Sequence, residues 1–115
     1  MAQSVAEVSR EALEQAVMRF FHMCNTHCPG NLAPLMTPDV ELRADREARG
    51  QEAVNAYFVE LWEGYPELTF SVENLLVDGS SAVAEVSYSH GPGGAGDRCI
   101  VMQFKGSLIR RMRSY

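Results

Sequence analysis

The side chains of this sequence that could transfer a proton or hold an anion concentrate in two charged segments. The first, residues 43–49, reads Arg-Ala-Asp-Arg-Glu-Ala-Arg. At the mouth of an apolar cavity, the charged form of Asp45 would be disfavoured, and its carboxylate would become a usable proton acceptor at neutral pH. The same composition is also typical of a solvated charged loop, so both interpretations of Asp45 stay open.

The second charged segment is the C-terminal one, which carries three arginines in four residues. Alternation along a strand places Ile109, Arg111, Arg113 and Tyr115 on one face, and Arg110 and Met112 on the other. If the Arg111 face is concave, its guanidinium could stabilise an enolate, a carboxylate or a phenolate. The alternative is a solvated edge strand whose charges prevent unwanted pairing.

Two histidines and two cysteines lie within seven residues, His22, Cys24, His27 and Cys28. A zinc site needs tetrahedral convergence and usually brings a second ligand pair from elsewhere in the chain. On a helix, Cys24 continues an apolar stripe while His22 points away from it. We therefore expect a core cysteine and surface histidines, and neither a metal nor an organic cofactor.

Aromatic and apolar side chains could line a pocket for a flat apolar ligand, although plain core packing explains most of them equally well. The hydroxyl groups of Tyr57 and Tyr88 would provide polar contacts. His90 could act as a second proton carrier, although an exposed loop histidine is the default interpretation. The predicted ligand-binding residues are Phe20, Phe58, Trp62, His90, Ile100, Met102, Phe104 and Tyr115.

Helical periodicity dominates the first half of the chain. Residues 13–24 place their apolar side chains on one face, and the segment Ser4–Glu7 has the form of a capping box. Residues 32–36 could form one or two further turns. Residues 54–65 then give the clearest amphipathic pattern; Gly64 could adopt a left-handed cap, and Pro66 prevents continuation.

Strand patterns dominate the second half. A short strand over Val40–Ala44 precedes a charged loop, residues 45–49, and four longer strands follow the second long helix, over residues 68–77, 82–90, 98–104 and 108–115. A slip of phase near Asn74 predicts a β-bulge in the first of these four. Two short turns and a flexible glycine-rich connection, residues 91–96, join the four as a meander, so the expected class is α+β.

The composition describes a single globular domain spanning residues 1–115. A net charge of −5 argues against a nucleic-acid partner, and no apolar run is long enough to span a membrane. No secretory signal is visible at the start, and three cysteines, an odd number, fit a reducing cytoplasm better than a disulfide framework. We therefore expect a cytoplasmic protein.

Four segments in this order resemble the nuclear transport factor 2-like superfamily, and within it the SnoaL-like and ketosteroid isomerase-like proteins. They are Leu-Met-Thr-Pro-Asp-Val at 35–40, Gly-Gln-Glu-Ala-Val at 50–54, Tyr-Pro-Glu-Leu at 65–68 and Val-Asp-Gly at 77–79. The resemblance implies a cone-shaped α+β barrel, in which three N-terminal helices pack on a strongly curved, mainly antiparallel sheet around an apolar pocket. It also implies a homodimer formed through the outer sheet face, where Val83, Glu85, Val101 and Gln103 would lie.

The departures from the isomerase pattern limit the chemistry that the resemblance implies. Where the isomerases carry two hydrogen-bond donors for the developing oxyanion, this chain has Phe20 and Ile100, and their aspartate base aligns with Ala44, next to Asp45. We therefore do not expect steroid isomerisation by that machinery.

The resulting functional prediction is a SnoaL-like enzyme that applies general acid/base chemistry, of isomerase, cyclase or hydrolase type, to an apolar carbonyl-bearing or cyclic compound. Asp45 would be the base, Tyr57 or Tyr88 a hydrogen-bond donor, and Arg111 an anion stabiliser. The alternative is a non-catalytic ligand-binding or dimerisation module on the same fold.

Overall fold

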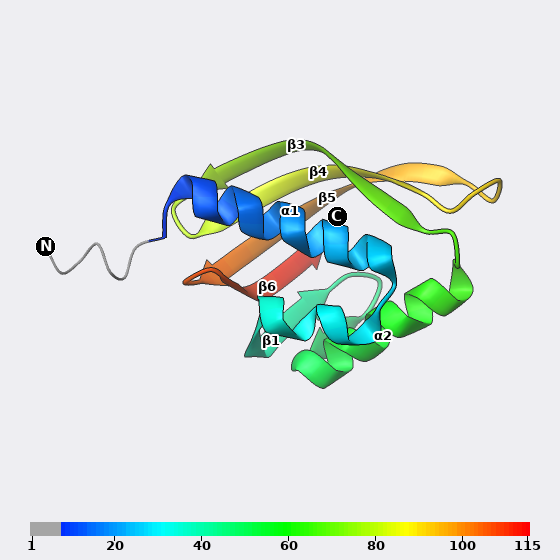
Figure 1. The fold of residues 1–115 in the computed structure, drawn as a ribbon, viewed down its shortest axis with the longest axis horizontal. Helices are drawn as coiled ribbons and strands as arrows, with labels where there is room; N and C mark the ends of the chain where they lie inside the picture. Colours follow the sequence, from blue (N-terminus) through cyan, green and yellow to red (C-terminus); the bar gives the residue numbers. More distant parts are fainter. Residues whose placement is uncertain (1–7) are drawn as a thin grey trace, which may run out of the picture.

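The computed structural model describes residues 8–115, which form two helices, two short 3-10 turns and one sheet (Figure 1). The helical elements are α1 (Arg10–Thr26), η2 (Pro29–Asn31), η3 (Ala33–Leu35) and α2 (Gln51–Gly64). The strands are β1 (Met36–Arg43), β2 (Glu47–Arg49), β3 (Thr69–Asp78), β4 (Ser81–Ser89), β5 (Ala95–Lys105) and β6 (Leu108–Ser114). Neither long helix combines the length and apolarity that a transmembrane passage requires within these residues.

The six strands form one curved sheet in the order β2-β1-β6-β5-β4-β3. Strands β3 to β6 follow one another as an antiparallel meander, and β1 joins this meander through a parallel pairing with β6. Helix α1 runs along the concave side of the long strands (Figure 1). The predicted α+β class and mainly antiparallel curved sheet are therefore confirmed, although the sheet is not closed, because β2 and β3 are both edges.

Helix α1 begins at Arg10, directly after its N-cap residue. Ser9 is the N-cap, and its hydroxyl oxygen accepts a hydrogen bond from the backbone N–H of Ala12 at 3.1 Å. The predicted capping box, Ser4–Glu7, lies outside the described residues. The expected apolar face is buried, and it comprises Leu13, Val17, Phe20, Phe21 and Cys24.

Helix α2 ends at Gly64, as predicted, but not through a left-handed glycine. Gly64 is absent from the residues with positive φ, and Tyr65 follows it with φ −135°. A residue before proline avoids the helical region because the proline ring clashes with it. Pro66, rather than the conformational freedom of Gly64, therefore ends this helix.

The first predicted strand and charged loop differ from the structure in extent. Strand β1 begins at Met36, and its pairing with β6 is irregular between Met36 and Glu41, where Pro38 cannot donate to the ladder. The end of the predicted loop forms the short strand β2, in which Leu42 pairs with Ala48. Ala48 is buried while its charged neighbours are exposed. The high proportion of charged residues therefore led to the prediction of a loop where the structure has a strand.

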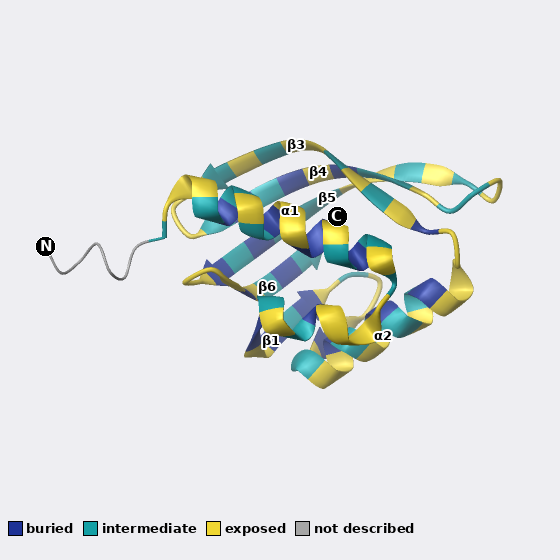
Figure 2. Cartoon of the chain, viewed as in Figure 1, coloured by how far each residue is buried: buried dark blue, intermediate teal, exposed yellow. Residues whose placement is uncertain are grey.

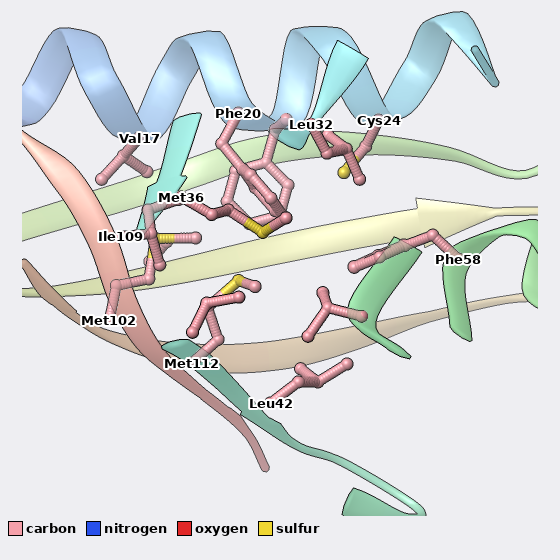
Figure 3. Close-up of a cluster of buried hydrophobic side chains, with 14 of the residues drawn as sticks. Val17, Phe20, Cys24, Leu32, Met36, Leu42, Phe58, Met102, Ile109 and Met112 are labelled. Atoms are coloured by element: carbon pink, nitrogen blue, oxygen red, sulfur yellow. The ribbon is translucent and has the colours of Figure 1, made fainter. Parts of the chain in front are cut away.

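The closed end of the interior is rich in methionine. Met36, Met102 and Met112, from three different strands, converge with Ile109 below Phe20 of α1 (Figure 3). Burial alternates along β4 and β5 and declines toward the hairpin that joins them (Figure 2). The hairpin end of these two strands is therefore the open end of the interior.

Strict alternation along β6 was a wrong expectation, because a bulge changes its phase. Gln103 pairs with Arg111 while Phe104 pairs with Ile109, which leaves Arg110 without a partner. Ile109 and Met112 consequently both point into the core. The Arg111 face of β6 is the outer face of the sheet, not the concave one.

Candidate functional site

A cavity of about 510 Å³ opens between the C-terminal half of α1, helix α2 and the concave face of the sheet. Its buried walls are apolar and include Phe20, Phe21, Leu42 and Phe58. Its half-buried and exposed lining carries the polar groups, which are Asp45, Tyr57, Tyr65, Tyr88, His90, Arg98, Ser114 and Tyr115. The volume and the mostly apolar walls are typical of a small-molecule site.

Asp45 and Tyr57 form a hydrogen-bonded pair at the mouth of this cavity. The Tyr57 hydroxyl donates to Asp45 Oδ1 at 2.8 Å. The backbone N–H of Ala44 donates to the carbonyl of Arg46 at 2.9 Å, a tight turn that places Asp45 opposite α2. Burial, followed by the hydrogen bond to Asp45 and the carboxylate charge, raises the pKa of Tyr57 to about 12. Tyr57 is therefore a hydrogen-bond donor at neutral pH.

The ring of Tyr57 is held on its other side by an arginine. The guanidinium carbon of Arg46 lies 5.1 Å from the ring centroid, and Arg46 also forms an ion pair with Glu60 of α2 at 3.1 Å. Both charged side chains are about half exposed, so the ion pair itself contributes little to stability. Its effect is to fix the orientation of the Tyr57 ring beside Asp45.

Three aromatic rings stand together at the end of β4. The ring of His90 lies 4.7 Å from that of Tyr65 and 6.1 Å from that of Tyr88, between centroids. Glycines make this arrangement possible, because a Cβ on Gly96 would lie 2.6 Å from the Tyr88 hydroxyl oxygen. A Cβ on Gly94, whose φ is +148°, would lie 3.2 Å from the His90 ring.

Arg98 also lines the cavity, and the sequence reasoning above missed it. It pairs with Val86 across β4 and β5, and the buried side chain of Val86 marks this as the concave face. The guanidinium carbon of Arg98 lies 5.5 Å from the Tyr88 ring centroid, within range of a cation–π contact. The alternation that groups Ile100 with Met102 extends back to Arg98, and this signal could have identified it.

The structure brings most of the predicted site residues to one cavity. Those that line it are Asp45, Tyr57, Tyr88, Phe20, Phe58, His90, Ile100 and Tyr115. Met102 and Phe104 lie instead in the packed closed end of the core, and Trp62 is buried against His27, with ring centroids 5.2 Å apart.

Arg111 is not part of this cavity. It lies on the outer face of the sheet, where its Nε is 3.5 Å from a carboxylate oxygen of Glu41, and its Nη1 donates to the side-chain oxygen of Gln103 at 3.3 Å. The bulge at Arg110 accounts for this placement. Arg98 is the arginine that takes the position expected of Arg111.

The histidines and cysteines of residues 22–28 do not converge. Cys24 is buried along the cavity wall, and burial raises the pKa of its thiol, so it stays protonated. Cys28 and His22 are exposed, and His27 donates from Nε2 to the carbonyl of Leu68 at 2.6 Å. Across residues 8–115, no three His, Cys, Asp or Glu side chains gather as a metal ion would need.

Comparison with protein families gives one match over most of the chain: the model of the SnoaL-like domain family matches residues 17–112. A search of curated proteins finds no significant match.

Solved structures give close matches in fold. A protein from Sinorhizobium meliloti assigned as a polyketide cyclase has a TM-score of 0.81 and 17% identity, covering 88% of this chain and 94% of its own. A protein from Kribbella flavida DSM 17836 assigned as a ketosteroid isomerase has a TM-score of 0.78 and 19% sequence identity. The match covers 90% of this chain and 76% of that protein. A nuclear transport factor 2-like protein of unknown function from Cytophaga hutchinsonii ATCC 33406 has a TM-score of 0.77 and 12% sequence identity. The match covers 90% of this chain and 88% of that protein. At these identities the matches show the fold alone.

Proposed function

Because this chain belongs to the SnoaL-like domain family, we propose that it is an enzyme that moves a proton on a small molecule held in the cavity. The substrate class is an apolar, carbonyl-bearing or cyclic compound, and the chain acts as one domain without a metal or an organic cofactor. The observation that carries this proposal is the Asp45–Tyr57 pair, which places a carboxylate at the mouth of an apolar cavity.

In the proposed reaction, the carboxylate of Asp45 takes a proton from the carbon next to a substrate carbonyl. The C–H bond breaks, an O–H bond forms on Asp45, and the electron pair becomes an enolate. The proton then returns at another carbon, which gives an isomer. Alternatively, the enolate carbon adds to a second carbonyl to close a ring, and the oxygen of that carbonyl takes the proton from Asp45. Tyr57 binds Oδ1 and thereby leaves Oδ2 for the substrate.

A hydrogen-bond donor to the developing enolate oxygen is also needed, since Phe20 and Ile100 line the cavity without donating. The Tyr88 hydroxyl is the candidate, because Tyr88 lies on the opposite wall from Tyr57 and lines the same cavity.

A second candidate function, ligand binding without catalysis, also has an observation in its favour. The Asp45 side chain is exposed to solvent rather than enclosed by the apolar walls of the cavity. A binding module would use the same apolar walls and would not depend on the Asp45 carboxylate.

Substitution of Asp45 separates these two functions. On a panel of activated ketones and epoxides, we expect Asp45→Asn to lower kcat by about 100-fold to 10,000-fold, a range typical of the loss of a general base, while ligand binding is retained. The matched control is Glu47→Gln, which neutralises a carboxylate two residues away that pairs with Arg43 outside the cavity. Unchanged turnover in Asp45→Asn, or no turnover by the wild type, would favour the binding module.

A further inference from the structure

We propose that the cavity takes an acid, and that the guanidinium of Arg98 binds the anionic group of an otherwise apolar ligand. This inference rests on the proposed function only in taking the cavity as the ligand site. The observation that carries it is a guanidinium on the concave face of the sheet that forms no ion pair within the described residues.

Arg98 forms no ion pair within residues 8–115. Its one hydrogen bond there runs from Nη1 to the neighbouring carbonyl of Asp97, at 3.3 Å. Arg46, which contacts the cavity-lining Tyr57, is instead paired with Glu60. A guanidinium has five N–H donors, so most of those on Arg98 are available to a ligand.

The contact with Tyr88 orients this free guanidinium. Its carbon lies 5.5 Å from the ring centroid, and stacking on a ring leaves the N–H groups at the edge of the guanidinium plane available. That edge presents two parallel donors, which match the two oxygens of a carboxylate. Lysine at this position would provide the charge without the bidentate geometry.

The polarity of β5 matches a ligand with two dissimilar ends. Along its concave face, Phe104 and Met102 are buried, Ile100 is half-buried and Arg98 is exposed. A ligand lying along this face would place an apolar body against Ile100 and an anionic group at Arg98. The ligand class that fits is therefore an aryl or alicyclic carboxylic acid, with the Asp45 carboxylate at the same mouth facing its uncharged part.

Two probes of equal shape test this assignment. Naphthalene-1-carboxylate and naphthalene-1-carboxamide share a ring system and differ in charge. Titration calorimetry should show that the wild type binds the carboxylate about tenfold more tightly than the amide, as expected for one partly exposed charge-assisted hydrogen-bonding pair. In Arg98→Gln, the two affinities should become equal, while the affinity for the amide stays as in the wild type and reports an intact cavity.

The control variant is Arg19→Gln, which removes the same charge from the exposed face of α1. It should keep the tenfold preference, and Arg98→Lys should keep only part of it. Equal affinities in the wild type, binding of neither probe, or an equal loss in Arg19→Gln would overturn the inference.

The test is independent of turnover. If the carboxylate preference is found and Asp45→Asn retains full activity, the proposed function fails and the acid-binding site stands. If Asp45→Asn abolishes turnover and both probes bind equally, only the acid-binding site fails.

Discussion

Tyr57 connects the apolar wall of the cavity to its charged mouth. Its ring meets the ring of Phe58 edge to face at 5.4 Å between centroids, and its hydroxyl donates to Asp45. Desolvation and Asp45 raise its pKa, and the positive charges of Arg46 and Arg98 offset only part of that rise. The effect of Arg98 on Tyr57 also means that the two side chains share one electrostatic environment, although they come from different elements.

The raised pKa of Tyr57 makes stability depend on alkaline pH in a defined direction. The folded-state pKa of about 12 exceeds the reference value of 10.0, so the stabilising contribution of Tyr57 is complete below pH 10 and is lost between pH 10 and pH 12. The difference in unfolding free energy between the wild type and Tyr57→Phe, measured by urea denaturation, should therefore be constant below pH 10 and shrink above it. Tyr115→Phe, which removes an exposed phenol, is the matched control. A Tyr57→Phe difference that stays constant up to pH 12 would contradict the prediction.

At the scale of elements, the C-terminal end of α1 closes the open edge of the sheet. The Asn25 amide nitrogen donates to the carbonyl of Phe70 at 2.9 Å, and its oxygen accepts from the Phe70 N–H at 2.8 Å. One side chain thus pairs with an edge strand as a neighbouring strand would. His27 adds a third bond, to Leu68, so the helix end is fixed to the start of β3.

Removal of this pairing should loosen β3 locally. We expect Asn25→Ala to lower the unfolding free energy by about 1–3 kcal/mol, since two partly buried hydrogen bonds are lost. The exchange of the Phe70 amide hydrogen should accelerate more than that of amides in β5. Asn31→Ala, which removes one exposed side-chain bond to Thr26, should have a small effect. Equal losses of unfolding free energy in the two variants would show that the hydrogen bonds between Asn25 and Phe70 do not stabilise the fold.

The elements that could be predicted from sequence are those whose signal is local. The buried stripe of α1 and the bulge of β3, found between Val72 and Asn74, follow from the spacing of apolar residues. The bulge at Arg110 could not be predicted, because no local pattern marks it and it exists only relative to the pairing with β5. That one shift moved Arg111 from the expected site to the outer face. Strand β2 was hidden because its pairing depends on one buried alanine between two charged residues.

At the scale of the whole molecule, the outer face of the sheet has no cover within residues 8–115. Val83 pairs with Val101 on this face, opposite the buried side chains of Ala82 and Ala84, and both valines are half-buried. Gln103 and Arg111 pair beside them. The homodimer expected from the resemblance would bury this face, and it stays a prediction.

A charge at the centre of this face tests the predicted homodimer. We expect the wild type to sediment as a dimer and Val101→Glu to sediment as a monomer, because pairing two copies would bury the introduced carboxylates without partners. Glu52→Gln, an exposed change on α2 away from the sheet, is the control and should leave the dimer intact. A monomeric wild type, or a dimeric Val101→Glu, would contradict this assembly.

Three polar side chains at the mouth of the cavity, Tyr88, His90 and Arg98, come from a single hairpin, β4–β5. The closed end of the interior is formed by α1 and several strands together. The apolar walls of the cavity are formed by core residues such as Phe20, Leu42 and Phe58. If Arg98 binds an anionic group as proposed, exchanging the tip of this hairpin between homologous proteins should transfer that preference while the buried Met36 and Met102 stay in place.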